Sequence, residues 1–305
     1  MRNNKSRILI MLPWSEFFLG TEQFMYAMVV ELLRREYSVD IFSYLKKVHW
    51  EFLRTTGATL LDNDVIEDKY DLAIINGNNC LIKAPKSAFK IFISHGTVPS
   101  VEIPIPGADR YVSISQEVQY NLKKYAYDSI IIRNGIDCER FKSVKKINKK
   151  LKTVLVLNNQ ISQDGLDFKI INEVCNEMNL TLLPLGLGCG TSQWETEGWI
   201  NESDLVISMG RGIYEAMACG RNAIVAGYGR MVGFVDNKTY PEFLRYNCAG
   251  RDRHPILSKE NLKTEFKKYS EVQGKKNREL ALKYNDIKKT VQNFLDLYNY
   301  KNLNI

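Results

Sequence analysis

The chain alternates short apolar runs with amphipathic stretches of helical period. The run ILIML at 8–12 is followed by apolar residues at helical spacing between 24 and 33, and then by VDIFSY at 39–44. A strand, a helix and a second strand in this order form a βαβ unit, whose parallel strands are buried on both faces. This alternation restricts the chain to an α/β architecture.

The same alternation continues on both sides of a lysine-rich run, FKSVKKINKKLK at 141–152. Further strands are predicted at 71–76, 90–95, 111–115, 129–134, 153–158, 180–186, 204–210 and 222–227. With 305 residues and 45% hydrophobic content, the chain can build two cores. We therefore predict two doubly wound, Rossmann-like domains facing a cleft, at 1–147 and 148–258, joined by that run as a linker. A helical tail at 259–305 is expected to pack back across them through its apolar face, Ile287, Val291, Phe294, Leu295 and Tyr298.

The charge balance is basic, with 42 Lys and Arg against 35 Asp and Glu, a net charge of +7. This balance suits an anionic ligand or an acidic membrane surface, and no pattern typical of nucleic-acid recognition accompanies it. The six cysteines contain no C-x-x-C pair, so no structural zinc site is predicted. Pro13 and Glu16 interrupt the first apolar run, and no run reaches membrane-spanning length. We expect a cytoplasmic protein, with peripheral contact at the inner membrane face as an option.

The stretch GRGIYEAMACG at 210–220 lies between two predicted strands. Ile213, Met217 and Ala218 suit a helix packed on a sheet, but Arg211 and Glu215 do not. They fall where a strand ends and a helix begins, which is where open α/β sheets bind ligands. With Gly212 in the first turn, the helix N-terminus and the Arg211 guanidinium could together bind a phosphate.

Three stretches resemble one family, the two-domain nucleotide-sugar glycosyltransferases of the GT-B fold, in particular the retaining group numbered family 4. They are LGTEQFMYAMVVELLRREYSVDIFS at 19–43, YVSISQEVQYNLKKYAYDSIIIRNGIDCERF at 111–141, and EAMACG at 215–220. The resemblance implies transfer of a sugar from a nucleotide diphosphate sugar to a saccharide or lipid-linked acceptor. It also implies polysaccharide biosynthesis, with no metal and no other cofactor.

The resemblance also assigns roles to single residues. It implies that Glu215 accepts hydrogen bonds from the ribose hydroxyls of the donor, and that His95, at the end of a predicted strand, approaches the transferred sugar as the catalytic residue. Gly20, followed by Thr21 as a plausible helix N-cap, matches the glycine of the family's phosphate loop. For each of these residues a purely structural role is the alternative.

Diphosphate binding needs cations, and Arg211 is the first candidate. Its structural alternative is a salt bridge or a carbonyl cap within the loop. Arg230, in the predicted loop AGYGRMVGF at 226–234, is a second candidate. Both would replace family residues that this chain lacks.

The chain departs from the family at four positions. Ile207 stands where the earlier of two glutamates is usual, Asn158 and Gln163 replace an arginine and a lysine, and Leu19 replaces a glycine. Two alternatives to transfer therefore stay open. One is a nucleotide-sugar epimerase or hydrolase of the same fold, and the other is a non-catalytic protein that binds a sugar nucleotide or a glycan.

Overall fold

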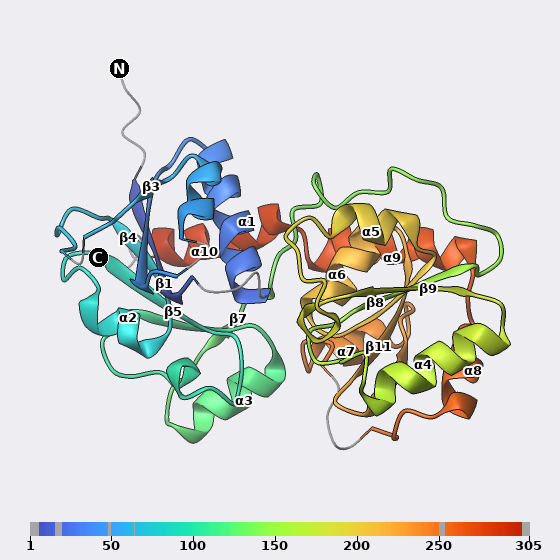
Figure 1. The fold of residues 1–305 in the computed structure, drawn as a ribbon. Helices are drawn as coiled ribbons and strands as arrows, with labels where there is room; N and C mark the ends of the chain where they lie inside the picture. The colour runs from blue at the N-terminus through green and yellow to red at the C-terminus, as the bar shows by residue number, and fades with distance from the viewer. Residues whose placement is uncertain (1–5, 16–19, 48–49, 64, 250–253, 301–305) are drawn as a thin grey trace. The chain divides into compact units, whose positions relative to one another are not determined.

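The computed structural model describes residues 6–15, 20–47, 50–63, 65–249 and 254–300. The chain forms two compact units (Figure 1). Unit 1 comprises Met1–Gly135 together with Ile287–Ile305, and unit 2 comprises Ile136–Asp286. Each unit is built around its own sheet, as the two series of apolar runs predict.

Unit 1 contains a seven-stranded sheet in the order β3-β2-β1-β4-β5-β6-β7. All neighbouring strands are parallel. The strands are β1 (Arg7–Trp14), β2 (Ser38–Leu45), β3 (Thr59–Leu60), β4 (Leu72–Asn76), β5 (Phe89–Ser94), β6 (Arg110–Ser113) and β7 (Ile130–Ile131). The helices are α1 (Gly20–Arg34), α2 (Asn78–Lys83), α3 (Gln116–Lys124) and α10 (Ile287–Asn299), with short 3-10 turns η1 (Glu51–Thr56) and η2 (Ser100–Glu102).

Both faces of the unit 1 sheet are covered, which is the doubly wound arrangement. Ile8, Ile10 and Leu12 of β1 pack in a core with α1 and α10, whereas Leu9 and Met11 face the opposite core, to which α2 contributes. Because successive strand residues point to opposite faces, a strand between two helical layers must be apolar throughout. This explains the unbroken run in β1.

Unit 2 contains a five-stranded sheet in the order β12-β11-β10-β8-β9. The strands are β8 (Thr153–Leu157), β9 (Thr181–Leu185), β10 (Leu205–Ser208), β11 (Asn222–Gly227) and β12 (Arg230–Phe234). The helices are α4 (Leu166–Glu177), α5 (Glu197–Glu202), α6 (Arg211–Ala218), α7 (Tyr240–Leu244), α8 (Lys259–Phe266) and α9 (Glu271–Tyr284), and η3 (Leu187–Cys189) is a 3-10 turn. Residues of α4 and α8 pack on one face, and residues of α5, α6, α7 and α9 pack on the other.

The predicted strands are all present, and two further strands were not predicted. β3 has only two residues, and β12 was expected to be part of a loop. β12 pairs antiparallel with β11 through a tight turn at Tyr228 and Gly229, both with positive φ. Such a two-residue turn matches the twist of adjacent strands, so the glycines of this stretch form a hairpin rather than an open loop.

The predicted division of the chain at residues 147 and 148 is wrong, because the units divide between Gly135 and Ile136. The lysine-rich run at 141–152 belongs to unit 2 and is not a linker. Phe141 and Ile147 are buried, and the Asp204 carboxylate accepts hydrogen bonds from the backbone N–H groups of Asn148 and Lys152. Because most residues of this run are exposed and many are lysines, its composition does not reveal these few buried contacts.

The tail is helical, as predicted, but it is shared between the units. α8 and α9 belong to unit 2, and α10 belongs to unit 1. The predicted apolar face of α10 packs in the same core as α1. The Arg35 guanidinium at the end of α1 also donates hydrogen bonds to the Gln292 side chain and the Lys288 carbonyl of α10, both at 2.7 Å. The last helix of the chain therefore completes the first unit.

Candidate functional site

In unit 2, α6 begins at the point where the strand order reverses. β8 lies between β9 and β10, and Leu157 and Ser208 are register partners at the ends of β8 and β10. Gly210, with φ 58°, turns the chain from β10 into α6. A Cβ on Gly212 would lie 2.2 Å from Ser208 Oγ, so only glycine lets the helix start so close to the strand. The N-terminus of α6 is thereby fixed at the ligand-binding edge of the sheet.

The predicted donor residues Arg211 and Glu215 form a buried ion pair. Arg211 Nε donates to Glu215 Oε1 at 2.8 Å, and the two side chains are 8% and 4% exposed. Thr196 Oγ1 donates to the other oxygen, Oε2, at 3.3 Å. Burial raises the pKa of Glu215 and lowers the pKa of Arg211, and each partner's charge opposes the other's shift. The structural alternative for Arg211, a salt bridge, is thus present, and it holds the Glu215 carboxylate in place.

A second arginine, which the sequence did not single out, acts on the same carboxylate. The positive charge of Arg140 lowers the pKa of Glu215, against the effect of burial. Arg140 contacts both oxygens of Glu197, at 3.1 and 2.8 Å, and its guanidinium stacks on the rings of Phe141 and Trp194. Arg140 directly precedes Phe141, the aromatic residue that ends the 111–141 stretch. Its position within this stretch is the feature of the sequence that could have indicated it.

Asn158 and Gln163, the uncharged residues at the positions of the family's arginine and lysine, form hydrogen bonds with backbone groups. Asn158 Nδ2 donates to the Ala226 carbonyl, and Asn158 Oδ1 accepts from the Gln160 N–H. Gln163 Nε2 donates to the Cys189 carbonyl. A Cβ on Gly186 would lie 2.3 Å from the Asn158 carbonyl oxygen. The loops after β8 and β9 therefore pack backbone to backbone, which explains Gly186 and Gly188 of PLGLGCGT, whereas Gly190 has open space and a positive φ of 67°.

Arg230 lies at the start of β12, where its Nη1 donates to the His254 carbonyl at 3.3 Å. Gly20, in unit 1, is exposed and is the first residue of α1, so Thr21 lies inside the first turn and is not the N-cap that was predicted. Leu19, which replaces a family glycine, lies outside the described residues. Of the residues expected to bind the donor, Gly20 belongs to unit 1, and Arg211, Gly212, Glu215 and Arg230 belong to unit 2.

In unit 1, His95 directly follows β5. The Asn76 amide donates from Nδ2 to the Met11 carbonyl at 3.1 Å, which directs Asn76 Oδ1 toward the imidazole. His95 Nε2 lies 2.6 Å from this oxygen and therefore carries the proton. Burial lowers the pKa of His95 to about 4, although the side chain of Asn134 opposes the shift. The imidazole is neutral at physiological pH.

A carboxyl group that the sequence did not indicate lies beside His95. Glu102 Oε2 accepts the His95 backbone N–H at 2.6 Å. Burial raises the pKa of Glu102 to about 7, against hydrogen bonds from His95, Ser94 and Gly96. Asn78 holds η2, which carries Glu102, by donating to the carbonyls of Ser100 and Ile103. Because Glu102 is seven positions beyond His95 in an irregular loop, no periodic pattern could indicate it.

Two further observations concern the described residues as a whole. No helix among them combines the length and apolar character that crossing a membrane requires. Within the same part of the chain, no three His, Cys, Asp or Glu side chains come together in a group that could hold a metal ion.

Comparison with known proteins gives a match at the level of the fold. Neither the protein-family models nor the curated protein sequences include a match to this chain. Among solved structures, Anabaena HepE in complex with UDP-glucose is similar, with a TM-score of 0.69, 13% identity, and coverage of 97% of this chain and 100% of that one. A glycosyltransferase from Rickettsia africae has a TM-score of 0.66 and 13% identity, covering 99% and 100% of the two chains.

A protein described as a putative UDP-N-acetylglucosamine 2-epimerase from Listeria monocytogenes is similar as well. Its TM-score is 0.56 at 14% identity, with coverage of 95% of both chains. These similarities extend over nearly the whole chain, so the protein has the GT-B fold, with two Rossmann-like units. Glycosyltransferases and an epimerase share this fold, so it does not decide between these two activities.

Proposed function

We propose that the protein is a glycosyltransferase that uses a nucleotide diphosphate sugar, with unit 2 as the donor-binding unit. The observation that carries the proposal is the Glu215 carboxylate, fixed one turn inside α6 at the ligand-binding edge of the sheet. An ionised carboxylate has about four lone-pair sites, and Arg211 and Thr196 occupy one on each oxygen. It can therefore accept ribose hydroxyls while the ion pair stays intact.

The diphosphate would be stabilised by the partial positive charge at the N-terminus of α6 and by the positive charges of Arg211 and Arg140. The first N–H groups of a helix have no intrahelical acceptors and attract anions. Arg211 lies in the first turn, and the charge of Arg140 reaches Glu215. We propose a uridine nucleotide because HepE was solved with UDP-glucose. These groups would perform the role of a metal, so we expect transfer to persist in EDTA.

Binding and turnover test this proposal separately. Calorimetry with UDP, GDP and TDP is expected to show binding that Glu215→Ala weakens by at least about tenfold. Glu242→Ala is the matched control, since it removes an exposed carboxylate of the same unit, paired with Arg245. With UDP-glucose and other UDP-sugars, nucleotide release that requires a saccharide or lipid-linked acceptor supports transfer. Binding without turnover on any acceptor would contradict it and favour a non-catalytic protein.

We propose that transfer retains the anomeric configuration, because EAMACG resembles the donor helix of the retaining group. The family's earlier glutamate is replaced by Ile207, which is fully buried in β10. The anomeric proton of the product, observed by NMR, distinguishes retention from inversion. An inverted product would contradict the resemblance on this point.

An epimerase is the second candidate, and unit 1 provides the observation in its favour. Epimerisation needs groups that exchange protons near the sugar, and a carboxyl group with a pKa of about 7 can do so at neutral pH. Glu102 and the neutral His95 are such a pair. Incubation of UDP-sugars in D₂O without acceptor is the test. Deuterium in the recovered sugar, lost in Glu102→Gln, would replace transfer as the conclusion.

A further inference from the structure

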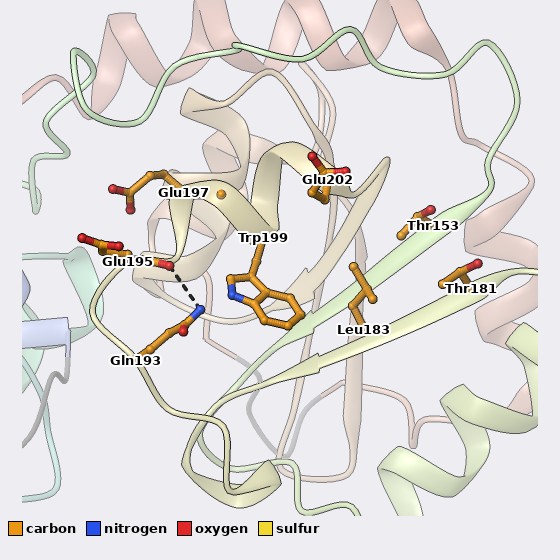
Figure 2. Close-up of a pocket in the computed structure, with 9 residues that line it drawn as sticks. Thr153, Thr181, Leu183, Gln193, Glu195, Glu197, Trp199 and Glu202 are labelled. Carbon is orange, nitrogen blue, oxygen red and sulfur yellow. Dashed lines mark hydrogen bonds between the residues drawn. The ribbon is translucent and has the colours of Figure 1, made fainter.

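Unit 2 has a pocket of about 760 Å³ whose lining does not include Arg211 or Glu215. Its walls come from the first residues of β8 and β9, from the face of α5, and from the segment preceding α5 (Figure 2). This volume is in the range of sites for small molecules, roughly 300–1,000 Å³. None of the roles proposed above uses it.

The floor of the pocket follows from strand register. Thr153 and Thr181 are register partners, as are Leu155 and Leu183 two residues further along each strand. Since every second strand residue points to the same side, the two threonines lie on the face of Leu183. β9 is the edge strand, and Leu183 stays partly exposed there. The floor thus combines hydroxyl groups with an apolar surface.

The wall opposite is formed by Trp199 of α5. Figure 2 shows its indole projecting between the Gln193 and Leu183 side chains. Ile200 and Asn201, the next residues of α5, are buried beneath the helix, which anchors it. Gly198 also lines the pocket, and a Cβ there would meet nothing within 4 Å, so a larger side chain fits at this exposed position. The indole is partly buried against the core of unit 2, and the side of it that lines the pocket can face a flat ligand.

The charges of the pocket exclude one class of ligand and disfavour another. Three of the lining residues are glutamates and none is Lys or Arg, so the lining offers no cationic partner to phosphates and other anions. Glu197 pairs with Arg140, and Glu202 pairs with Lys145, so two of these carboxylates already have cationic partners. In Figure 2 the Glu195 and Glu197 carboxylates lie away from the indole. A cation therefore gains little at the aromatic surface, and a neutral ligand is favoured.

We propose that this pocket binds a neutral oligosaccharide, with one sugar ring stacked on Trp199 and its hydroxyls bonded to Thr153, Thr181 and Gln193. A pyranose ring has an apolar face for the indole and a rim of hydroxyls for these polar groups. The assignment rests on the pocket alone. Under the proposed function, the oligosaccharide is part of the acceptor or of the growing product.

The saccharide and the nucleotide would bind at the same time. Glu195 and Glu197 line the pocket, whereas Thr196 between them donates its hydroxyl to Glu215. The two sites therefore use alternate residues of one short segment, and a saccharide in the pocket would not replace the Thr196–Glu215 hydrogen bond.

The test uses calorimetry and saturation-transfer NMR on the full chain with maltotetraose, cellotetraose, chitotetraose, spermidine and UDP. At least one tetrasaccharide is expected to bind. Its affinity should fall by at least about tenfold in Trp199→Ala. Gly198→Leu adds a bulky side chain at a lining residue without a clash and should also weaken binding. Tyr120→Ala, which removes an exposed aromatic of unit 1, should change nothing, and all variants should keep UDP affinity within about twofold.

Each of the other outcomes contradicts either the proposed ligand of the pocket or the proposed function. If no tetrasaccharide binds while UDP does, or if both pocket variants bind it as the wild type does, this inference fails and the proposed function stands. Binding of spermidine that Trp199→Ala abolishes would replace the neutral ligand with a cation. If a tetrasaccharide binds in a Trp199-dependent way but none of UDP, GDP and TDP does, the pocket is correct and the glycosyltransferase proposal fails.

Discussion

The two candidate sites occupy the same edge of their respective sheets, but they hold ionisable groups, partly buried in unit 1 and buried in unit 2, in different ways. In unit 1, amide and backbone groups hold His95 and Glu102, and burial shifts both pKa values toward the neutral forms, to about 4 and about 7. In unit 2, Arg211 and Glu215 hold each other as an ion pair. Burial without a counter-ion favours proton exchange, whereas burial with one favours fixed charge. The first arrangement suits chemistry at the sugar, and the second suits a diphosphate and a ribose.

The largest effect is expected from breaking the ion pair. Glu215→Ala leaves a buried guanidinium without its partner, which should lower the free energy of unfolding by about 3–5 kcal/mol. The double variant Arg211→Met/Glu215→Leu should recover most of this loss, because it removes both charges. Urea denaturation followed by circular dichroism measures both. A loss in Glu215→Ala no greater than in Glu242→Ala would show that the pair does not hold unit 2 together.

The next effect is a pH dependence specific to unit 1. The pKa of Glu102 is raised from 4.5 to about 7, so its contribution to stability is fully present below pH 4.5 and is lost as the pH rises through 7. Glu102→Gln should abolish this loss, which is on the order of 3 kcal/mol. Thermal unfolding midpoints measured across this range provide the check.

His95 titrates in the opposite sense, so it serves as an internal control for that experiment. Its pKa is lowered from 6.5 to about 4, and its contribution is lost as the pH falls through this interval. Wild type and Glu102→Gln share this loss, and only the difference between them reports on Glu102. Identical pH profiles would mean that Glu102 is not buried as described.

A smaller effect on stability and on UDP affinity is expected at Arg140. This residue pairs with Glu197, and its positive charge lowers the pKa of Glu215. Arg140→Lys keeps the charge but loses the two-point contact with Glu197 and the stacking on Trp194. We expect a loss of about 1 kcal/mol in stability and a few-fold loss in UDP affinity. Unfolding and calorimetry on the same preparation measure the two values. Unchanged UDP binding would leave Arg211 as the arginine of the donor site.

The smallest effect is expected at Arg230. Its contact with the His254 carbonyl is a single hydrogen bond at the start of an edge strand. Arg230→Ala should therefore change the free energy of unfolding by no more than about 0.5 kcal/mol. UDP affinity, measured by calorimetry, should stay within about threefold. A larger drop in affinity would bring Arg230 into the donor site, as the sequence predicts.

The sequence by itself determined the α/β class, ten of the strands and the helical tail, because buried strands and amphipathic helices have apolar patterns that depend on local order alone. It also indicated that Arg211 and Glu215, as charged residues, do not suit a helix that packs on a sheet. It could not locate the boundary of the units, because Phe141 and Ile147 anchor a run that looks like solvated linker.

Only the tertiary structure decided how the charged residues are used. Arg211 and Glu215 are four residues apart on one helix, so a salt bridge was foreseeable, but burial of the pair required the packing of α5 and its Thr196. Glu102 reached His95, and Arg140 reached Glu197, through loops whose paths no periodicity encodes. The charge of a buried group depends on neighbours that are distant in sequence. The sequence therefore indicated which residue types are present, but it could not predict their protonation.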